Sequence, residues 1–172
     1  MEILNWANMS ARRLPALLAA VVLTAALSGC SAADGSAVPA PTPSGEQAGP
    51  CRALHKKLPA TVNGMKRRTT APVSDFTAAW GDPPIVLRCG VNRPLVVTPG
   101  YKRYNPNADT VEIGGVEWLP ERQPDGSIRC TTSKRQAWVE VTLPKKTVLD
   151  GDFGLFADLS DAVKETVPFG II

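Results

Sequence analysis

The clearest alternation of hydrophobic and polar residues lies at residues 137–143. Its hydrophobic positions are Ala137, Val139, Val141 and Leu143. Alternate side chains of a strand point to opposite faces of a sheet, so the pattern predicts a strand with one buried face. Residues 85–89 alternate in the same way, and residues 127–132 follow a turn signal at Asp125-Gly126. We expect two further strands at these places.

Gly114-Gly115 joins two more alternating runs and predicts a β-hairpin with a two-residue turn. In that register Val111 faces Trp118, and Glu112 lies opposite Glu117. Like charges in opposed positions destabilise a strand pair. We therefore expect either water to screen the two carboxylates or a cation to lie nearby, with Arg122, Arg129 and Arg135 as candidates.

Hydrophobic residues recur at helical spacing at both ends of the remaining chain. Residues 51–58 form one amphipathic segment, which Pro59 ends, and residues 155–167 form a longer one. Ser74 is a candidate N-cap for a short helix over residues 75–80. Residues 92–107 are rich in proline and predict a loop, with a short strand at 95–98.

Together these elements predict a single α+β domain over residues 51–172. The predicted strands cluster in the middle of the chain and the helices at its ends. This order favours a single antiparallel sheet of about five strands with two or three helices packed on one face.

The N-terminal segment carries a targeting signal. Arg12 and Arg13 precede an uncharged run from residue 14 to residue 27. A positive segment followed by a short apolar core is typical of a secretory signal, so residues 1–29 are predicted to be a signal peptide. The run of about 14 residues is shorter than the roughly 20 that span a bilayer as a helix, which makes an uncleaved anchor the weaker alternative.

The run ends in Leu27-Ser28-Gly29-Cys30, which resembles the box of bacterial lipoproteins. In that class the cysteine thiol takes a diacylglycerol and the chain is cut directly before it. Cys30 is thus the predicted lipidation site, membrane lipid is the predicted partner of the anchor, and the outer face of the cell membrane is the predicted location. Acylation with two or more chains holds a protein firmly at a bilayer. Ordinary secretion, with Cys30 cleaved away or free, is the alternative.

Residues 30–50 are predicted to be a lipidated cysteine followed by a tether. Sixteen of the twenty residues from 31 to 50 are Ala, Gly, Ser, Pro or Thr. Such a segment buries too little apolar surface to offset its ordering entropy. We therefore expect a disordered linker that holds the folded domain just off the membrane surface.

Three cysteines remain for the oxidising compartment in which disulfides persist: Cys51, Cys89 and Cys130. They allow three single bridges. Cys51–Cys89 and Cys89–Cys130 each close a loop of about 40 residues, worth about 4 kcal/mol in the chain-entropy model, so loop entropy does not separate them. A zinc site is the weaker alternative, because no CxxC or HxxxH spacing is present.

Charge narrows the classes of partner. The formal net charge is +3 and the isoelectric point is about 8.8. A nucleic-acid-binding domain usually has an isoelectric point above about 9 and a clustered basic stripe, so no nucleic-acid partner is predicted. The densest basic run, Lys66-Arg67-Arg68, indicates either a solvated strand that protects a sheet edge or a contact with anionic lipid headgroups.

Candidate chemistry is sparse, and neither a metal site nor a cofactor is predicted. His55, the single histidine, lies beside the apolar stripe of its helix, which favours a solvated or capping role over catalysis. Cys130 is expected to face the core, where a thiol is inert. A pocket of aromatic faces and polar anchors is a candidate ligand site, formed by Trp80, Asp82, Arg88, Trp118 and Arg135. A rigid corner at residues 80–84 is the alternative.

One longer motif is specific. It reads Trp80-Gly81-Asp82-Pro83-Pro84-Ile85-Val86-Leu87-Arg88-Cys89-Gly90-Val91, with Cys51 upstream and Gly115-Val116-Glu117-Trp118 downstream. The motif resembles an actinobacterial lipoprotein family known as "domain of unknown function 3515". The resemblance implies an envelope lipoprotein with no assigned activity. It also favours the Cys51–Cys89 bridge, since both cysteines belong to the pattern, and leaves Cys130 as the odd thiol.

Two classes of function follow from these observations. We favour a non-enzymatic protein that binds an envelope protein or a cell-wall component, because no catalytic constellation is recognisable. The alternative is a cell-wall-acting enzyme, which requires the carboxylates of Glu112, Glu117 or Asp82 to converge in one deep pocket. A thiol–disulfide redox protein is a minor alternative and requires an exposed Cys130 near the Cys51–Cys89 bridge.

Overall fold

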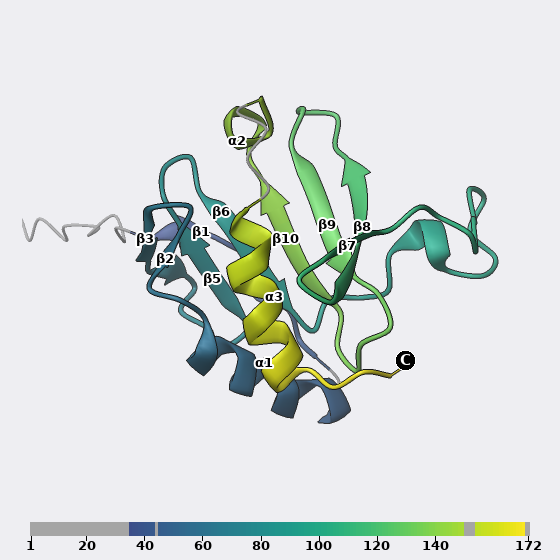
Figure 1. Cartoon of the computed structure of the whole chain (residues 1–172), viewed down its shortest axis with the longest axis horizontal. Helices are drawn as coiled ribbons and strands as arrows, with labels where there is room; N and C mark the ends of the chain where they lie inside the picture. The colour runs from purple at the N-terminus through teal and green to yellow at the C-terminus, as the bar shows by residue number, and fades with distance from the viewer. Residues whose placement is uncertain (1–34, 44, 150–153, 171–172) are drawn as a thin grey trace, which may run out of the picture. The chain divides into compact units, whose positions relative to one another are not determined.

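A computed structural model describes residues 35–43, 45–149 and 154–170 (Figure 1). The predicted signal peptide and Cys30 lie outside these residues. The helices are α1 (Gly45–Lys57), α2 (Lys145–Leu149) and α3 (Leu155–Thr166), with a 3-10 turn η1 (Leu95–Val97). The strands are β1 (Ser36–Ala37), β2 (Thr61–Val62), β3 (Met65–Arg68), β4 (Thr70–Ala71), β5 (Thr77–Trp80), β6 (Ile85–Cys89), β7 (Val111–Ile113), β8 (Val116–Arg122), β9 (Ile128–Thr132) and β10 (Val139–Leu143).

The main sheet is antiparallel throughout. Its eight strands follow the order β2-β3-β5-β6-β10-β9-β8-β7, and β1 pairs with β4 in a separate parallel ladder of two strands. The α+β class is as predicted, and β6 to β10 correspond to the five predicted strands. The strand count of about five is wrong, because β2, β3 and β5 extend the sheet at one edge. These strands are two to four residues long, which is too short for an alternating pattern to stand out.

One face of the sheet is covered by helices. In Figure 1, α3 lies across the strands, and α1 runs beside the C-terminal end of α3. The inward positions of neighbouring strands are in register, because Val139 pairs with Cys89 and Val141 pairs with both Leu87 and Cys130. These side chains form one buried cluster with Leu54 of α1 and with the apolar face of α3.

Residues 77–80 form strand β5, where the sequence predicts a helix over residues 75–80. Ser74 does not cap a helix, and its Oγ accepts a hydrogen bond from the backbone N–H of Phe76 at 3.1 Å. All four residues of β5 are buried and pair with β6. Since no position of β5 faces solvent, the pairing partner rather than local propensity decides its conformation. Likewise, the short strand predicted at 95–98 is the 3-10 turn η1.

Part of the predicted tether is ordered. The N–H of Ser36 donates to the carbonyl of Thr69, the N–H of Val38 donates to that of Ala71, and Val38 is 2% exposed. Helix α1 starts at Gly45, six residues before the predicted domain boundary at 51. The composition of residues 31–50 predicted disorder because the segment has few apolar residues of its own. In the structure, residues 36–38 are held by hydrogen bonds to residues 69–71. Gly90 adopts φ +83°, and a Cβ there would come within 2.3 Å of Pro43.

The structure contains the Cys51–Cys89 disulfide that the family resemblance favoured. It joins α1 to β6, and both cysteines are at most 1% exposed. Cys130 is the free cysteine of the described residues and is buried on β9. Within the same residues, none of the helices has the length and apolar character needed to cross a membrane.

Candidate functional site

The five residues of the predicted pocket do not share a pocket in the described part of the chain. Trp80 and Trp118 are buried in the core, at 0% and 1% exposure. The indole N–H of Trp80 donates to the carbonyl of Pro59 at 3.0 Å, and that of Trp118 donates to Oγ of Ser160 at 3.1 Å. Both tryptophans therefore pack the core rather than present a face to a ligand.

The polar members of the set are also dispersed. Asp82 has a side chain that is 83% exposed and lies in the turn between β5 and β6. Arg135 donates to the carbonyls of Val167 at 3.2 Å and Gly115 at 2.9 Å, so it ties the end of α3 to the hairpin turn. Only Arg88 lines a groove.

The hairpin carboxylates have the predicted register, with Glu112 opposite Glu117. The neighbouring cation is Lys134 rather than one of the three predicted arginines, and its Nζ lies 2.6 Å from Oε1 of Glu117. This hydrogen bond lowers the pKa of Glu117, and Ser133 contributes in the same direction. Strands β6, β10 and β9, about 4.8 Å apart, separate Asp82 from this pair. The carboxylates of the proposed cell-wall enzyme therefore do not converge.

Cys130 is placed for packing rather than for redox chemistry. Burial raises the pKa of its thiol to about 12. It lines a small apolar cavity of about 300 Å³ with Trp118 and Phe156. The thiolate is the reactive form of cysteine, and a thiol with this pKa is protonated at neutral pH.

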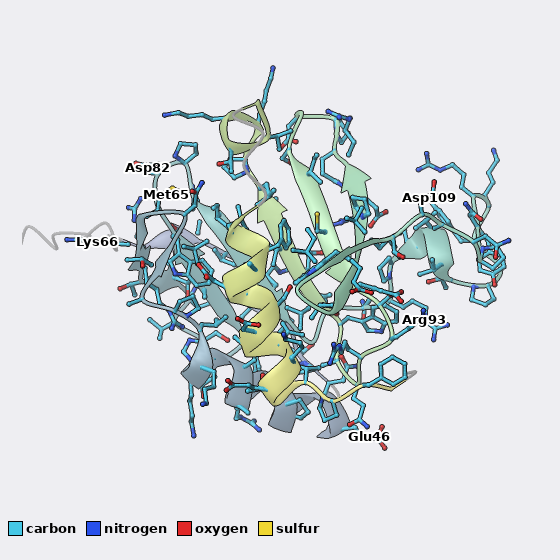
Figure 2. The ribbon with its side chains drawn as sticks, in the orientation of Figure 1. Glu46, Met65, Lys66, Asp82, Arg93 and Asp109 are labelled. Carbon is cyan, nitrogen blue, oxygen red and sulfur yellow. A yellow bond between two sulfur atoms is a disulfide. The ribbon has the colours of Figure 1, made fainter. Side chains whose placement is uncertain are left out.

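The basic run at residues 66–68 lies on β3, next to the edge strand β2. Nη1 of Arg67 donates to the carbonyl of His55 at 3.4 Å, and Nη1 of Arg68 donates to that of Gly81 at 3.2 Å. Lys66 is exposed, and Figure 2 shows it at one side of the sheet with Asp82, away from Arg93 and Asp109. Two of the three basic side chains thus stabilise local structure.

The face of the sheet opposite the helices carries a row of charges on its central strands. Arg88 on β6 pairs in register with Glu140 on β10, and Arg129 on β9 pairs in register with Glu121 on β8. Nη1 of Arg88 lies 3.1 Å from Oε1 of Glu140, and Nη2 of Arg129 lies 3.1 Å from Oε2 of Glu121. Nε of Arg129 is 3.8 Å from Oε2 of Glu140, which joins the four side chains into one network.

We call the hollow above this network the charged groove. It consists of two cavities of about 520 and 620 Å³ that share Leu95, Glu121 and Arg129. Residues 40–42 and 90–95 border the first cavity, and residues 95–96, Tyr101 and Arg103 border part of the second. Nε of Arg88 donates to the carbonyl of Pro39 at 3.1 Å. Arg88, in the floor of the groove, therefore also holds the N-terminal segment that borders it.

Sequence reasoning found Arg88 but missed Glu140, Arg129 and Glu121 as site residues. The alternation at 137–143 did place Glu140 on the polar face of its strand. Its neighbours on that face depend on which strands lie beside β10, and that order is a property of the tertiary fold. In the part of the chain that the structure describes, no group of three or more His, Cys, Asp or Glu side chains is arranged to hold a metal ion.

Comparison with known protein families identifies a relationship. The family model described as "Protein of unknown function (DUF3515)" matches residues 14–171. No curated protein and no solved structure matches the chain. The matched region includes the disulfide and the charged groove, and it extends over most of the 172 residues. The chain therefore belongs to the family of proteins of unknown function DUF3515.

Proposed function

We propose that this chain is a non-enzymatic binding protein of the cell envelope, anchored by diacylglycerol on Cys30 at the outer face of the cell membrane. The observation that carries the binding role is the charged groove, an ordered concave site of the size that small-molecule ligands use. Both carboxylates in it are bound by guanidinium groups. This arrangement suits recognition by charge and hydrogen bonding better than proton transfer.

The location is supported by the signal, the lipoprotein box and the buried disulfide. Disulfides persist in oxidising compartments outside the cytoplasm, and the Cys51–Cys89 bridge lies in the core, where it links α1 to the sheet. The predicted export signal and the buried disulfide both fit a chain that folds after export.

The ordered N-terminal segment brings the domain close to its anchor. Ser36 of β1 follows Cys30 by six residues, which reach at most about 20 Å when fully extended. An anchor on Cys30 would therefore hold the folded domain within a short distance of the membrane surface.

The anchor is tested by replacing Cys30 with alanine. We expect Cys30→Ala to leave the membrane fraction and appear in the medium, whereas Cys130→Ala, a matched cysteine variant, stays with the membrane. Mass spectrometry of the purified wild-type chain should show an N-terminus at Cys30 that carries acyl chains. A Cys30→Ala variant that stays bound to the membrane, or a wild-type chain without acyl groups on Cys30, contradicts the proposal.

A further inference from the structure

We infer that the charged groove binds a ligand carrying two or more oxyanion groups, phosphate or carboxylate, along a short extended molecule. The inference rests on the binding role proposed above and names the class of ligand. It does not depend on the lipid anchor, which the Cys30→Ala variant tests separately.

Charge is the first argument. Five arginines line the joined cavities, against the two glutamates of the network: Arg88, Arg93, Arg103, Arg122 and Arg129. The lining therefore carries three more positive than negative side chains. Such a concentration of one sign in a concave site raises the local concentration of ligands of the opposite sign.

The geometry of the guanidinium groups is the second argument. Arg88 and Arg129 have side chains that are 31% and 36% exposed, whereas that of Glu140 between them is 10% exposed. The carboxylate therefore lies deepest in the floor of the groove, and the two guanidinium groups beside it are more exposed to a ligand. Within the described residues, the network uses Nε and Nη1 of Arg88 and Nε and Nη2 of Arg129. Nη2 of Arg88 and Nη1 of Arg129 make no protein hydrogen bond there and remain as donors for a ligand.

The residue type points to oxyanions. No lysine is among the described residues that line the two cavities. A guanidinium presents a planar fork of N–H donors that matches the oxygens of a phosphate or carboxylate, whereas an ammonium acts as a point charge. Glu140 and Glu121 hold the planes of Arg88 and Arg129 in place, so less side-chain entropy is lost when an oxyanion binds.

The extent of the groove indicates more than one anionic group. The two cavities extend from Arg88 on β6 to Glu121 on β8, across three strand spacings or about 14 Å. The two cavities share a wall and so form one continuous site rather than two separate ones. A single small anion would meet only part of the arginines, whereas an extended molecule with spaced oxyanions meets arginines in both cavities.

The test is calorimetric titration of the full chain, purified in a non-ionic detergent and in a buffer without phosphate. The probes are tripolyphosphate for the phosphate arm and citrate for the carboxylate arm, each at low and at physiological ionic strength. We expect at least one probe to bind, and binding to weaken at the higher salt, because the site is partly exposed. The probe that binds more tightly assigns the oxyanion.

Two groove variants and one matched control make the test specific. We expect Arg129→Gln, and separately the rim double variant Arg103→Gln/Arg122→Gln, to weaken binding by about tenfold or more. Arg103 and Arg122 are exposed, so the rim variant stays decisive if Arg129→Gln does not fold. Arg52→Gln removes an exposed arginine of α1 outside the groove and should change binding by less than about twofold. The inference is overturned if neither probe binds, or if Arg52→Gln weakens binding as much as the groove variants.

Discussion

Arg88 and Glu140 lie opposite each other on strands β6 and β10, and their side chains meet on the face of the sheet away from the helices, with Nη1 of Arg88 3.1 Å from Oε1 of Glu140. The second oxygen of the same carboxylate is 3.8 Å from Nε of Arg129. Glu140 is 8% exposed. One nearly buried carboxylate thus holds two arginines in the floor of the groove.

This relationship predicts a stability effect for Glu140→Gln. The variant keeps the shape of the side chain but removes the charge that both guanidinium groups face, so the free energy of unfolding should fall by about 1–3 kcal/mol. Urea unfolding measures the change. Glu165→Gln is the matched control, since the side chain of Glu165 is 58% exposed and pairs with Lys57 at 2.9 Å. An exposed pair is worth about 0–1 kcal/mol, and equal losses in both variants would contradict the central role of Glu140.

The disulfide predicts a redox-dependent stability. It links residues 38 positions apart, and breaking it frees a long loop in the unfolded chain. The Cys51→Ser/Cys89→Ser variant should therefore lose about 2–5 kcal/mol of unfolding free energy. Thermal melting of the wild-type chain with and without reductant provides the comparison. The reduced wild type should resemble the variant, and a melting temperature that reductant leaves unchanged would contradict the pairing.

A variant of Arg135 tests whether this residue has a structural role or belongs to the ligand site. Its guanidinium bonds the carbonyls of Val167 and Gly115 and lies outside the groove. We expect Arg135→Gln to lower the unfolding free energy by about 1 kcal/mol and to leave tripolyphosphate binding unchanged. Arg129→Gln should weaken the binding by about tenfold or more. A loss of binding in folded Arg135→Gln would return Arg135 to the ligand site that the sequence suggested.

His55 predicts a loss of stability on mild acidification. Burial lowers its pKa from 6.5, and the nearby Arg67 adds to the effect, although Asp75, with Oδ1 3.9 Å from Nδ1, acts in the opposite direction. Below pH 6.5 the imidazole of His55 is protonated more readily in the unfolded chain than in the folded chain. This part of the stability is therefore complete above pH 6.5 and decreases as the pH falls through the lowered pKa.

Urea unfolding at about pH 7.5 and about pH 5.5 tests this dependence. The difference between the two free energies should be smaller in His55→Gln than in the wild type, because the variant keeps the same carboxylates and lacks only the imidazole. Equal differences in the two proteins would show that His55 does not contribute.

Cys130 is predicted to be unreactive in the folded state. Its pKa of about 12, against an ordinary value of 9.0, reduces the thiolate at neutral pH by about a thousandfold. Iodoacetamide should modify Cys130 only after the chain is unfolded in denaturant, as measured by mass spectrometry of the peptide. Rapid alkylation of the native chain would contradict the buried position and would reopen a redox role.

Local sequence patterns predicted the elements whose partner is adjacent in the sequence and those that have one apolar and one polar face. The Gly114-Gly115 turn fixes its own hairpin, because positive φ values at both glycines suit a two-residue turn, and the register of Glu112 opposite Glu117 follows from it. Helix α3 showed the spacing of an amphipathic helix. The prediction at residues 75–80 was wrong because β5 is buried on both faces and has no solvent-exposed positions to reveal its period.

The sequence by itself determined what is encoded within a few residues: the central strands, the hairpin, α3 and the membership of a family. Only the tertiary structure decided that Glu140 lies between Arg88 and Arg129, that residues 36–38 are held against β4 while residues 40–42 border the groove, and that Trp80 and Trp118 face the core. The reason is physical. Periodicity states which face of a strand is polar, whereas the order of the strands, which brings distant polar faces together, depends on packing the whole core at once.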